Sequence, residues 1–438
     1  MSFRSVVKAF IPQKLFKKIE PWGHMAEAVL FNILNGFPAK DLKVMGVTGT
    51  NGKTSTCFLI HRMMVEAGYN VGLMTTVGYG VGNEIKPQIH HMTNVAVPEL
   101  MQRLKWFKKQ GVEWLVLETT SHALAQNRVW GIPFSLAVIT NVTHEHLDYH
   151  GSFESYRDAK RKLFKLANKN KKGLRTGVIN AEDPSSKLFE SDITYPLTYG
   201  VKAGGIRAAD IKSTSTGSDF TVKSPDYKTP QLKIHLNLPG SFNIYHALAA
   251  VGVGLALKLE PEQIEQGIAA LQSVEGRMTA IEEGQPFSVV VDYAHTPDSF
   301  EKLFKDLKPV VKGKLIVMFG SAGGQRDKAK RPVQGELAGK YADEVILTEE
   351  DDRDTPGEEI LNQIAEGAEK AGKVRDEDLF LVLDRSKAIK FTLSRAQVGD
   401  TVLLLGKGHE KTIERANGEH PWDEIGITRK ILEGILKK

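Results

Sequence analysis

The segment Thr48-Gly49-Thr50-Asn51-Gly52-Lys53-Thr54 decides the fold of this chain. It lies between an apolar stretch, residues 43–47, and a segment with helical periodicity. Glycines in such a turn let backbone amides approach phosphate oxygens, while Lys53 can neutralise the β- and γ-phosphates and Thr54 can place its hydroxyl on Mg²⁺. The helix that begins there adds free N–H groups and the positive end of its dipole. The segment therefore predicts a phosphate-binding loop, although Val47 stands where the general Walker pattern has glycine and an ordinary glycine-rich turn is the alternative.

Apolar strands alternate with helical segments on both sides of this loop. The strands are expected at residues 43–47, 114–117, 136–140, 177–180, 289–292, 315–319, 344–348 and 401–405. Such alternation predicts an α/β protein with mostly parallel sheets. Residues 203–234 differ, because they are rich in Ser, Thr and Lys with β-like alternation, and they predict an antiparallel β insertion or a sheet edge.

The chain length of 438 residues allows about three domains. A helical segment at residues 262–272 precedes Gly276, which breaks the pattern before a new series of strands. We therefore predict a short basic helical leader (1–43), a central P-loop ATP-binding domain (44–274) and a Rossmann-like α/β C-terminal domain (275–438). The leader should form short amphipathic helices, of which residues 25–35 are the clearest, ended by Gly36 and Pro38.

The composition is that of an ordinary soluble protein, with 41% hydrophobic and 25% charged residues. It excludes disordered, collagen-like and disulfide-scaffold proteins, and the single cysteine, Cys57, cannot form an internal disulfide. The longest uncharged apolar run, residues 247–257, is too short for a membrane span. The N-terminal segment has no signal-peptide pattern, so we expect a cytoplasmic protein.

The positive charge is concentrated in the leader. The whole chain has 58 Lys and Arg against 53 Asp and Glu, whereas residues 1–43 alone have seven basic and three acidic residues. The rest is nearly neutral, which argues against a nucleic-acid-binding protein. The basic amphipathic leader permits contact with a membrane surface or a protein, although a solvated helix pair docked on the ATP-binding domain is the simpler interpretation.

Several further segments extend the pattern of the phosphate loop. They are ETTSHAL (118–124), TNVTHEHLDYHG (140–151), YRDAK (156–160), GSFN (240–243), GRM (276–278), DYAHTPD (292–298), RD (326–327) with KRP (330–332), and GKGHE (406–410). Together with TGTNGKT, and in this order, they resemble the Mur ligase family over roughly residues 44–438. DYAHTPD and GKGHE point within the family to the MurE type.

The resemblance implies an ATP-dependent, ADP-forming ligase of cell-wall (peptidoglycan) peptide synthesis. Such an enzyme adds an amino acid, of the diaminopimelate or lysine type, to a UDP-N-acetylmuramoyl-dipeptide through an acyl phosphate. The site must collect negative charge, which divalent cations and fixed Lys or Arg can neutralise. ATP and Mg²⁺ are therefore the expected cofactors, the partners are small-molecule substrates without nucleic acid, and we expect a monomer.

For three residues, the role expected from the residue type alone differs from the role that the family resemblance implies. Alone, Glu118 after a strand is more often a solvated or capping residue, Lys160 more often lies on a solvated basic face, and His146 with His144, Asp148 and His150 suggests zinc as readily as Mg²⁺. The resemblance implies that Thr54, Glu118 and His146 bind Mg²⁺ and that Lys160 is carbamylated by CO₂, which would turn a cation into an oxygen-bearing anion. Lys53, His146 and Lys160 are then the expected catalytic residues.

The remaining site residues also follow from the resemblance. ATP would be bound by Gly49, Thr50, Asn51, Gly52, Lys53, Thr54, Ser55, Asn243, Arg277, Asp292 and His295. The acceptor would be bound by Thr93, Asn94, Ser121, His122, Gln126 and Arg128. The amino acid would be bound by Arg326, Asp351, Asp352, Arg353, Gly406 and Glu410.

The sequence departs from the family pattern at several places, among them Asn94, Thr119 and Thr120 in the acceptor-binding segments. Residues 1–43 are too few for the usual UDP-sugar-binding domain, which leaves open a ligase for folate, a poly-amino acid or a lipid carrier, or a non-catalytic nucleotide-binding partner. His246 stands where the family has a second asparagine. Residues 350–353 read EDDR where diaminopimelate enzymes have DNPR. The added acids favour a cationic side chain such as lysine, whereas Arg353 and Arg326 favour a carboxylate.

Overall fold

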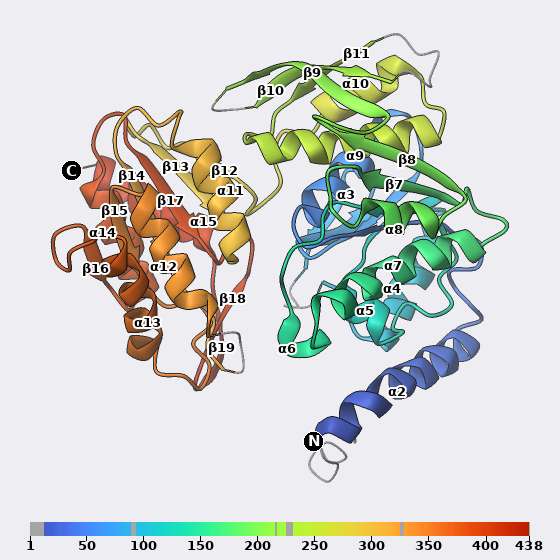
Figure 1. Ribbon diagram of the computed structural model, residues 1–438, viewed down its shortest axis with the longest axis horizontal. Helices are drawn as coiled ribbons and strands as arrows, with labels where there is room; N and C mark the ends of the chain where they lie inside the picture. Colours follow the sequence, from blue (N-terminus) through green and yellow to red (C-terminus); the bar gives the residue numbers. More distant parts are fainter. Residues whose placement is uncertain (1–12, 89–92, 215–216, 225–230, 325–327, 438) are drawn as a thin grey trace. The chain divides into compact units, whose positions relative to one another are not determined.

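The structure is a computed structural model that describes residues 13–88, 93–214, 217–224, 231–324 and 328–437 (Figure 1). The chain forms two compact units. The first holds most residues up to Leu271, and the second holds the residues from Gln272 onward with two short stretches, 212–218 and 236–243. The division into 1–43, 44–274 and 275–438 stays a prediction.

The first unit is built on an eleven-stranded sheet in the order β11-β10-β9-β8-β7-β6-β1-β5-β2-β3-β4. Its centre, β1 (Lys43–Thr48), pairs in parallel with both β5 (Trp114–Glu118) and β6 (Phe134–Ile139). Parallel pairing continues to β7 (Thr176–Asn180) and β8 (Tyr195–Gly200) on one side and to β2 (Val71–Met74) on the other. The central strands are buried along almost their whole length, as expected for parallel strands covered on both faces.

The two edges of this sheet are formed by shorter or half-buried strands. At one edge lie β3 (Gly78–Val81) and β4 (Glu84–Pro87), which are antiparallel to their neighbours. At the other lie β9 (Ile206–Ser213), β10 (Ser218–Lys223) and β11 (Leu232–Leu236), where buried and exposed residues alternate along β10 and β11. The sheet edge predicted for residues 203–234 is confirmed.

Helices pack against this sheet, and two of them matter for the site. α3 (Lys53–Glu66) begins directly at the phosphate loop. α7 (Phe153–Lys169) buries Tyr156, Lys160, Leu163, Phe164 and Ala167, which lie on one face at helical spacing. The others are α4 (Val97–Lys109), α5 (Ser121–Ala125), α6 (Leu147–His150), α8 (Ser186–Ser191), α9 (Ser241–Ala256) and α10 (Pro261–Ala269).

In the described part of the leader, residues 13–43, one helix, α2 (Gln13–Leu34), stands where short helices are predicted, so the prediction is wrong for residues 13–34. Pro21 lies inside α2, and the helix continues because His24, Ala28 and Asn32, four residues apart, form one buried stripe. The Asn32 side chain also donates to the carbonyl of Trp130 at 3.0 Å. The predicted end is confirmed, since Gly36 follows in a left-handed conformation. No helix within the described ranges has the length and apolar character of a membrane span.

The second unit has a six-stranded sheet in the order β12-β13-β17-β14-β15-β16. All its neighbouring strands are parallel except β12, and alternate residues of β14 point into two different apolar clusters, one on each face. The chain is therefore α/β, with a P-loop unit followed by a Rossmann-like unit, as predicted. The strands are β12 (Thr279–Ile281), β13 (Ser288–Asp292), β14 (Leu315–Phe319), β15 (Glu344–Leu347), β16 (Leu379–Leu381) and β17 (Thr401–Leu405), followed by the hairpin β18 (Thr412–Arg415) and β19 (Gly418–Pro421). The helices are α11 (Pro297–Leu307), α12 (Lys330–Tyr341), α13 (Gly357–Lys370), α14 (Arg385–Arg395) and α15 (Glu424–Leu436).

Candidate active site

The phosphate loop lies at the carboxyl end of β1, between the ends of β5 and β6. Two of its glycines are required by close approach. A Cβ on Gly49 would lie 1.8 Å from the hydroxyl of Thr140, and a Cβ on Gly52, whose φ is +81°, would lie 1.9 Å from Nε2 of His246. No side chain larger than hydrogen fits at either place, so the loop can keep this conformation against Thr140 and His246 only with glycine at both positions.

Asn141, which follows β6, holds the loop in shape. Its side chain accepts from the Asn51 amide at 3.0 Å and donates to the Asn51 carbonyl at 3.1 Å, while its own carbonyl accepts from the Thr50 amide at 2.8 Å. The Thr50 hydroxyl lies 3.0 Å from that of Tyr156. The loop is thus tied to both β6 and α7.

Two lysines converge on one carbonyl of the loop. Nζ of Lys53 lies 3.1 Å, and Nζ of Lys160 lies 2.6 Å, from the carbonyl oxygen of Gly49. Lys160 is only 1% exposed, so its interpretation as part of a solvated basic face is wrong. Burial, and secondly the charge of Lys53, hold the pKa of Lys160 well below its usual range. Both effects favour the uncharged amine over the ammonium.

Glu118 ends β5 beside the first turn of α3. Oε2 accepts from the hydroxyl of Thr54 at 3.0 Å and from the backbone amide of Thr76 at 3.0 Å, while Oε1 accepts from the Thr76 hydroxyl at 3.0 Å. It is buried, so the solvated alternative is also wrong. A carboxylate and a hydroxyl at this spacing form a donor set of the kind that Mg²⁺ prefers, and these residues fit the ion.

His146 lies in a cluster of aromatic side chains. The ring of His122 is centred 4.7 Å from that of His146 and 5.3 Å from that of His150, whose Nε2 is 3.1 Å from the hydroxyl of Ser121. Burial, and secondly the charges of His146 and His150, lower the pKa of His122 to about 3. Within the part of the chain that the structure describes, no three His, Cys, Asp or Glu side chains are arranged to hold a metal ion, so the zinc alternative gains no support.

The predicted acceptor residues gather around Glu118. The hydroxyl of Thr93 lies 2.8 Å from that of Thr76, whose own proton points to Glu118. The side chain of Asn94 donates to the Glu118 carbonyl at 2.8 Å, and its backbone carbonyl accepts from Arg128 at 2.7 Å. Ser121, His122 and Gln126 belong to α5 or its C-terminal cap.

Three residues predicted to contact the nucleotide, Arg277, Asp292 and His295, lie around the carboxyl end of β13, whereas Asn243 lies in the first turn of α9. The carboxylate of Asp292 accepts from the amides of Met278 and Ala294, each at 2.7 Å. Burial raises its pKa, against the charge of Arg277, whose guanidinium lies 4.5 Å from the ring centre of Tyr293. Nδ1 of His295 lies 2.8 Å from the carbonyl of Tyr293, and the Asn243 side chain donates to Pro239 at 2.6 Å.

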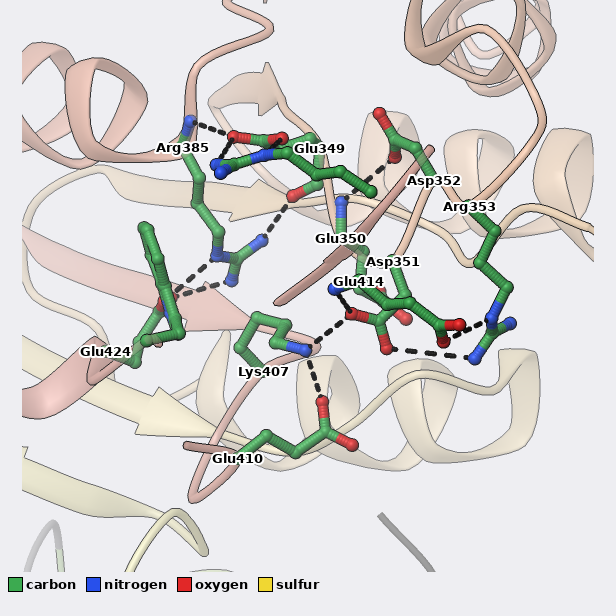
Figure 2. A network of polar contacts seen from close by, with 12 residues as sticks. Glu349, Glu350, Asp351, Asp352, Arg353, Arg385, Lys407, Glu410, Glu414 and Glu424 are labelled. Carbon is green, nitrogen blue, oxygen red and sulfur yellow. Dashed lines mark hydrogen bonds and ion pairs between the residues drawn. The ribbon is translucent and has the colours of Figure 1, made fainter. Parts of the chain in front are cut away.

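The predicted amino-acid residues meet beyond the ends of β15 and β17 (Figure 2). Fully buried Lys407 lies between Asp351 at 2.8 Å and Glu410 at 2.5 Å. Arg353 pairs with Glu414 at 2.7 Å, and its φ of 54° places it in the left-handed region. Arg326 lies outside the described residues.

Family models match two parts of the chain: the Mur ligase middle domain at residues 47–254, and the Mur ligase glutamate ligase domain at residues 276–408. A UDP-N-acetylmuramyl-tripeptide synthetase of Roseiflexus sp. (strain RS-1) is 42% identical over 427 residues, which cover 94% of this chain and 82% of that protein. The chain belongs to the Mur ligase family.

Other relatives of this Mur ligase carry a more specific name. The UDP-N-acetylmuramoyl-L-alanyl-D-glutamate–2,6-diaminopimelate ligase of Caldanaerobacter subterraneus is 38% identical over 412 residues, which cover 93% of this chain and 82% of that protein. A solved structure of an enzyme with this name has a TM-score of 0.62 and 29% identity, over 95% of this chain and 83% of that one.

Sequence reasoning missed several residues that shape the site of this Mur ligase. Asn141 and Lys407 belong to the motifs at residues 140–151 and 406–410. Their place in these motifs is the sequence signal that could have identified them as site residues. Thr76 and Glu414 lie outside every motif, and only the tertiary contacts reveal them. His246, which stands where the family has a second asparagine, lies against Gly52 of the phosphate loop.

Proposed function

We propose that this Mur ligase adds an amino acid of the diaminopimelate or lysine type to a UDP-N-acetylmuramoyl-dipeptide-like acceptor, with ATP converted to ADP. One observation carries the proposal: Lys53, Lys160 and the Thr54–Glu118 pair meet at the carboxyl edge of the central strands, where α/β sheets bind ligands. The relatives at about 40% identity act in the same chemistry by name.

The residues of the first unit divide the work of holding the nucleotide. Amides of residues 49–55 and the ammonium of Lys53 would cradle the phosphates, and Thr54, Glu118 and His146 would hold Mg²⁺. Bound ATP supplies the phosphoryl group that turns the acceptor carboxylate into an acyl phosphate. A neutral Lys160 amine has the free electron pair that attack on CO₂ requires, so its buried position favours carbamate formation. The carbamate oxygens would face Mg²⁺, which an ammonium would repel.

The other predicted residues would complete the site. Asn243, Arg277, Asp292 and His295 would contact ATP from the second unit. Thr93, Asn94, Ser121, His122, Gln126 and Arg128 would bind the acceptor. Asp351, Asp352, Arg353, Gly406 and Glu410, with Arg326, would bind the amino acid.

The test is a product screen by mass spectrometry with purified protein, ATP, Mg²⁺, muramoyl-dipeptide acceptors and a panel of amino acids. We expect one new amide product and ADP release that requires both acceptor and amino acid. Lys53→Ala should abolish both, because Lys53 holds the phosphates. ATP turnover that ignores every acceptor and amino acid would contradict the proposal, as would a Lys53→Ala protein that still forms the amide.

A further inference from the structure

A pocket of about 570 Å³ opens in the second unit beside the predicted amino-acid residues. Its lining includes four carboxylates and two guanidinium groups, from Glu349, Asp352, Asp354, Asp384, Arg353 and Arg415. A pocket that accepts a carboxylate needs a guanidinium left available for it. The partners of the two arginines therefore decide which ligand fits.

Both arginines are held by acids of the protein. Arg415 is paired side-on with Glu349, at 2.7 Å and 2.8 Å. Arg353 donates from Nε to Glu414 at 2.7 Å and lies 4.0 Å from Asp351 (Figure 2). The backbone fixes this second pair, because the Arg353 amide donates to the Glu414 carbonyl at 3.1 Å and the Glu414 amide donates to Asp351 at 2.9 Å. The hairpin strand β18 thus brings its own acid to Arg353.

The acids of the neighbouring loop carry more negative charge than the arginines balance. Burial, and then the charges of Glu349, Glu350 and Asp351, raise the pKa of Asp352 to about 6. Oε2 of Glu350 is buried and has no hydrogen-bond partner among the described residues. It lies 2.6 Å from where a Cβ of Gly406 would be, so only glycine at position 406 leaves room for the Glu350 carboxylate itself.

We propose that Glu414 is a specificity-determining residue: it neutralises Arg353 and turns this pocket to an amino acid whose distal end is an ammonium without a carboxylate. The carboxylate of Asp352, which lines the pocket, would face that ammonium, and the buried charge of Glu350 adds to the negative potential around it. This inference rests on the proposed function, and it chooses lysine-type over diaminopimelate-type substrates. A distal carboxylate would meet Asp352, while both guanidinium groups that the structure describes in the lining, Arg353 and Arg415, are already paired with acids of the protein. Like charges placed together disfavour a ligand strongly.

L-Lysine and meso-diaminopimelate form a matched pair of probes, because they differ only by the distal carboxylate, and L-ornithine tests the chain length. Kinetics of ADP release with the acceptor should give a kcat/KM for L-lysine or L-ornithine at least about tenfold above that for diaminopimelate. Glu414→Gln should reduce this ratio about tenfold, mainly through a lower KM for diaminopimelate, because it frees the charge of Arg353. Arg353→Met should change kcat/KM for lysine and for diaminopimelate by a similar factor, because Glu414 already neutralises the Arg353 charge.

The control is Glu433→Gln, which removes an exposed acid of α15 and should not change the ratio. The inference is overturned if diaminopimelate is used as well as lysine, if Glu414→Gln changes the ratio less than twofold, or if Arg353→Met selectively abolishes diaminopimelate use. Calorimetric titration of both amino acids separates this result from the proposed function. If no pair of acceptor and amino acid causes ADP release, the proposed ligase function is refuted and the pocket assignment is not. If diaminopimelate binds more tightly than lysine, or if neither amino acid binds, the pocket assignment is refuted.

Discussion

Replacing Arg385 by Met should strongly lower the free energy of unfolding of the second unit. Arg385 and Glu424 are both 0% exposed and share two hydrogen bonds, at 2.9 Å and 2.6 Å (Figure 2). Arg385 also donates to the carbonyls of Glu349 at 3.0 Å and Leu405 at 2.7 Å. The arginine thus joins α14 and α15 to the carboxyl ends of β15 and β17.

The magnitude follows from the burial of the partner. Without Arg385, Glu424 keeps a hydrogen bond from the Trp422 indole at 2.7 Å but loses its only described cation partner. Breaking a fully buried pair in this way costs about 3–5 kcal/mol. For a unit of this size each kcal/mol lowers the melting temperature by about 2–4 °C, so we expect a loss of about 6–20 °C. The double variant Arg385→Met/Glu424→Met should lose less than Arg385→Met alone, because no unpaired buried charge remains.

Hydrogen-exchange mass spectrometry is the appropriate assay, because a chain with two units need not unfold in one step. Amides of β15 and β17 should exchange faster in Arg385→Met, whereas those of β1 and β5 should not change. Thermal unfolding monitored by calorimetry supplies the temperature shift. A loss below about 1 kcal/mol, or a double variant less stable than Arg385→Met, would refute this reasoning.

Three further predictions concern the site itself. Gly52→Ala should abolish ATP binding measured by calorimetry, because its Cβ would lie 1.9 Å from His246; Gly68→Ala, at a similar φ of +88° in open space, is the control that should still bind ATP. Lys160→Met should abolish ligation and flatten the pH dependence of the unfolding free energy. Burial lowers the pKa of the native amine, so the native state holds this proton less readily than the unfolded chain, and wild-type stability should rise as pH approaches the usual lysine pKa from below. An unchanged slope in the variant would count against this. The KM for L-lysine should fall as pH rises through about 6, the raised pKa of Asp352, because the ionised carboxylate attracts the ammonium of the substrate. Asp352→Asn should remove this fall in KM. A fall that persists in the variant would exclude Asp352 as its source.

Much of the fold could be predicted because its signals are local. Every predicted strand is present within a residue or two, since apolar runs bounded by turns determine parallel strands. The leader was harder, because a buried stripe spaced over residues 24–32 carries one helix past Pro21, and only packing reveals that stripe.

The candidate site was predictable only where residue type reveals chemistry. Lys53 and Thr54, within their glycine-rich segment, are enough to predict a phosphate loop. Lys160 has the sequence context of a surface lysine, and only the packing of α7 shows that it is buried against Gly49. The charge preference near Arg353 could not be read from residues 350–353, because the deciding partner, Glu414, lies on β18, about sixty positions later.

The hairpin β18–β19 has a consequence for how such an enzyme can change over generations. Its two strands have only four residues each, and they form a sheet of their own, separate from the six-stranded sheet. Substitutions there can alter the charge that the amino-acid pocket offers without disturbing the loops that carry the energy-supplying chemistry. Choice of building block and activation of the acceptor can therefore evolve independently, and a lineage can exchange one residue of its wall peptide while the ligation machinery stays intact.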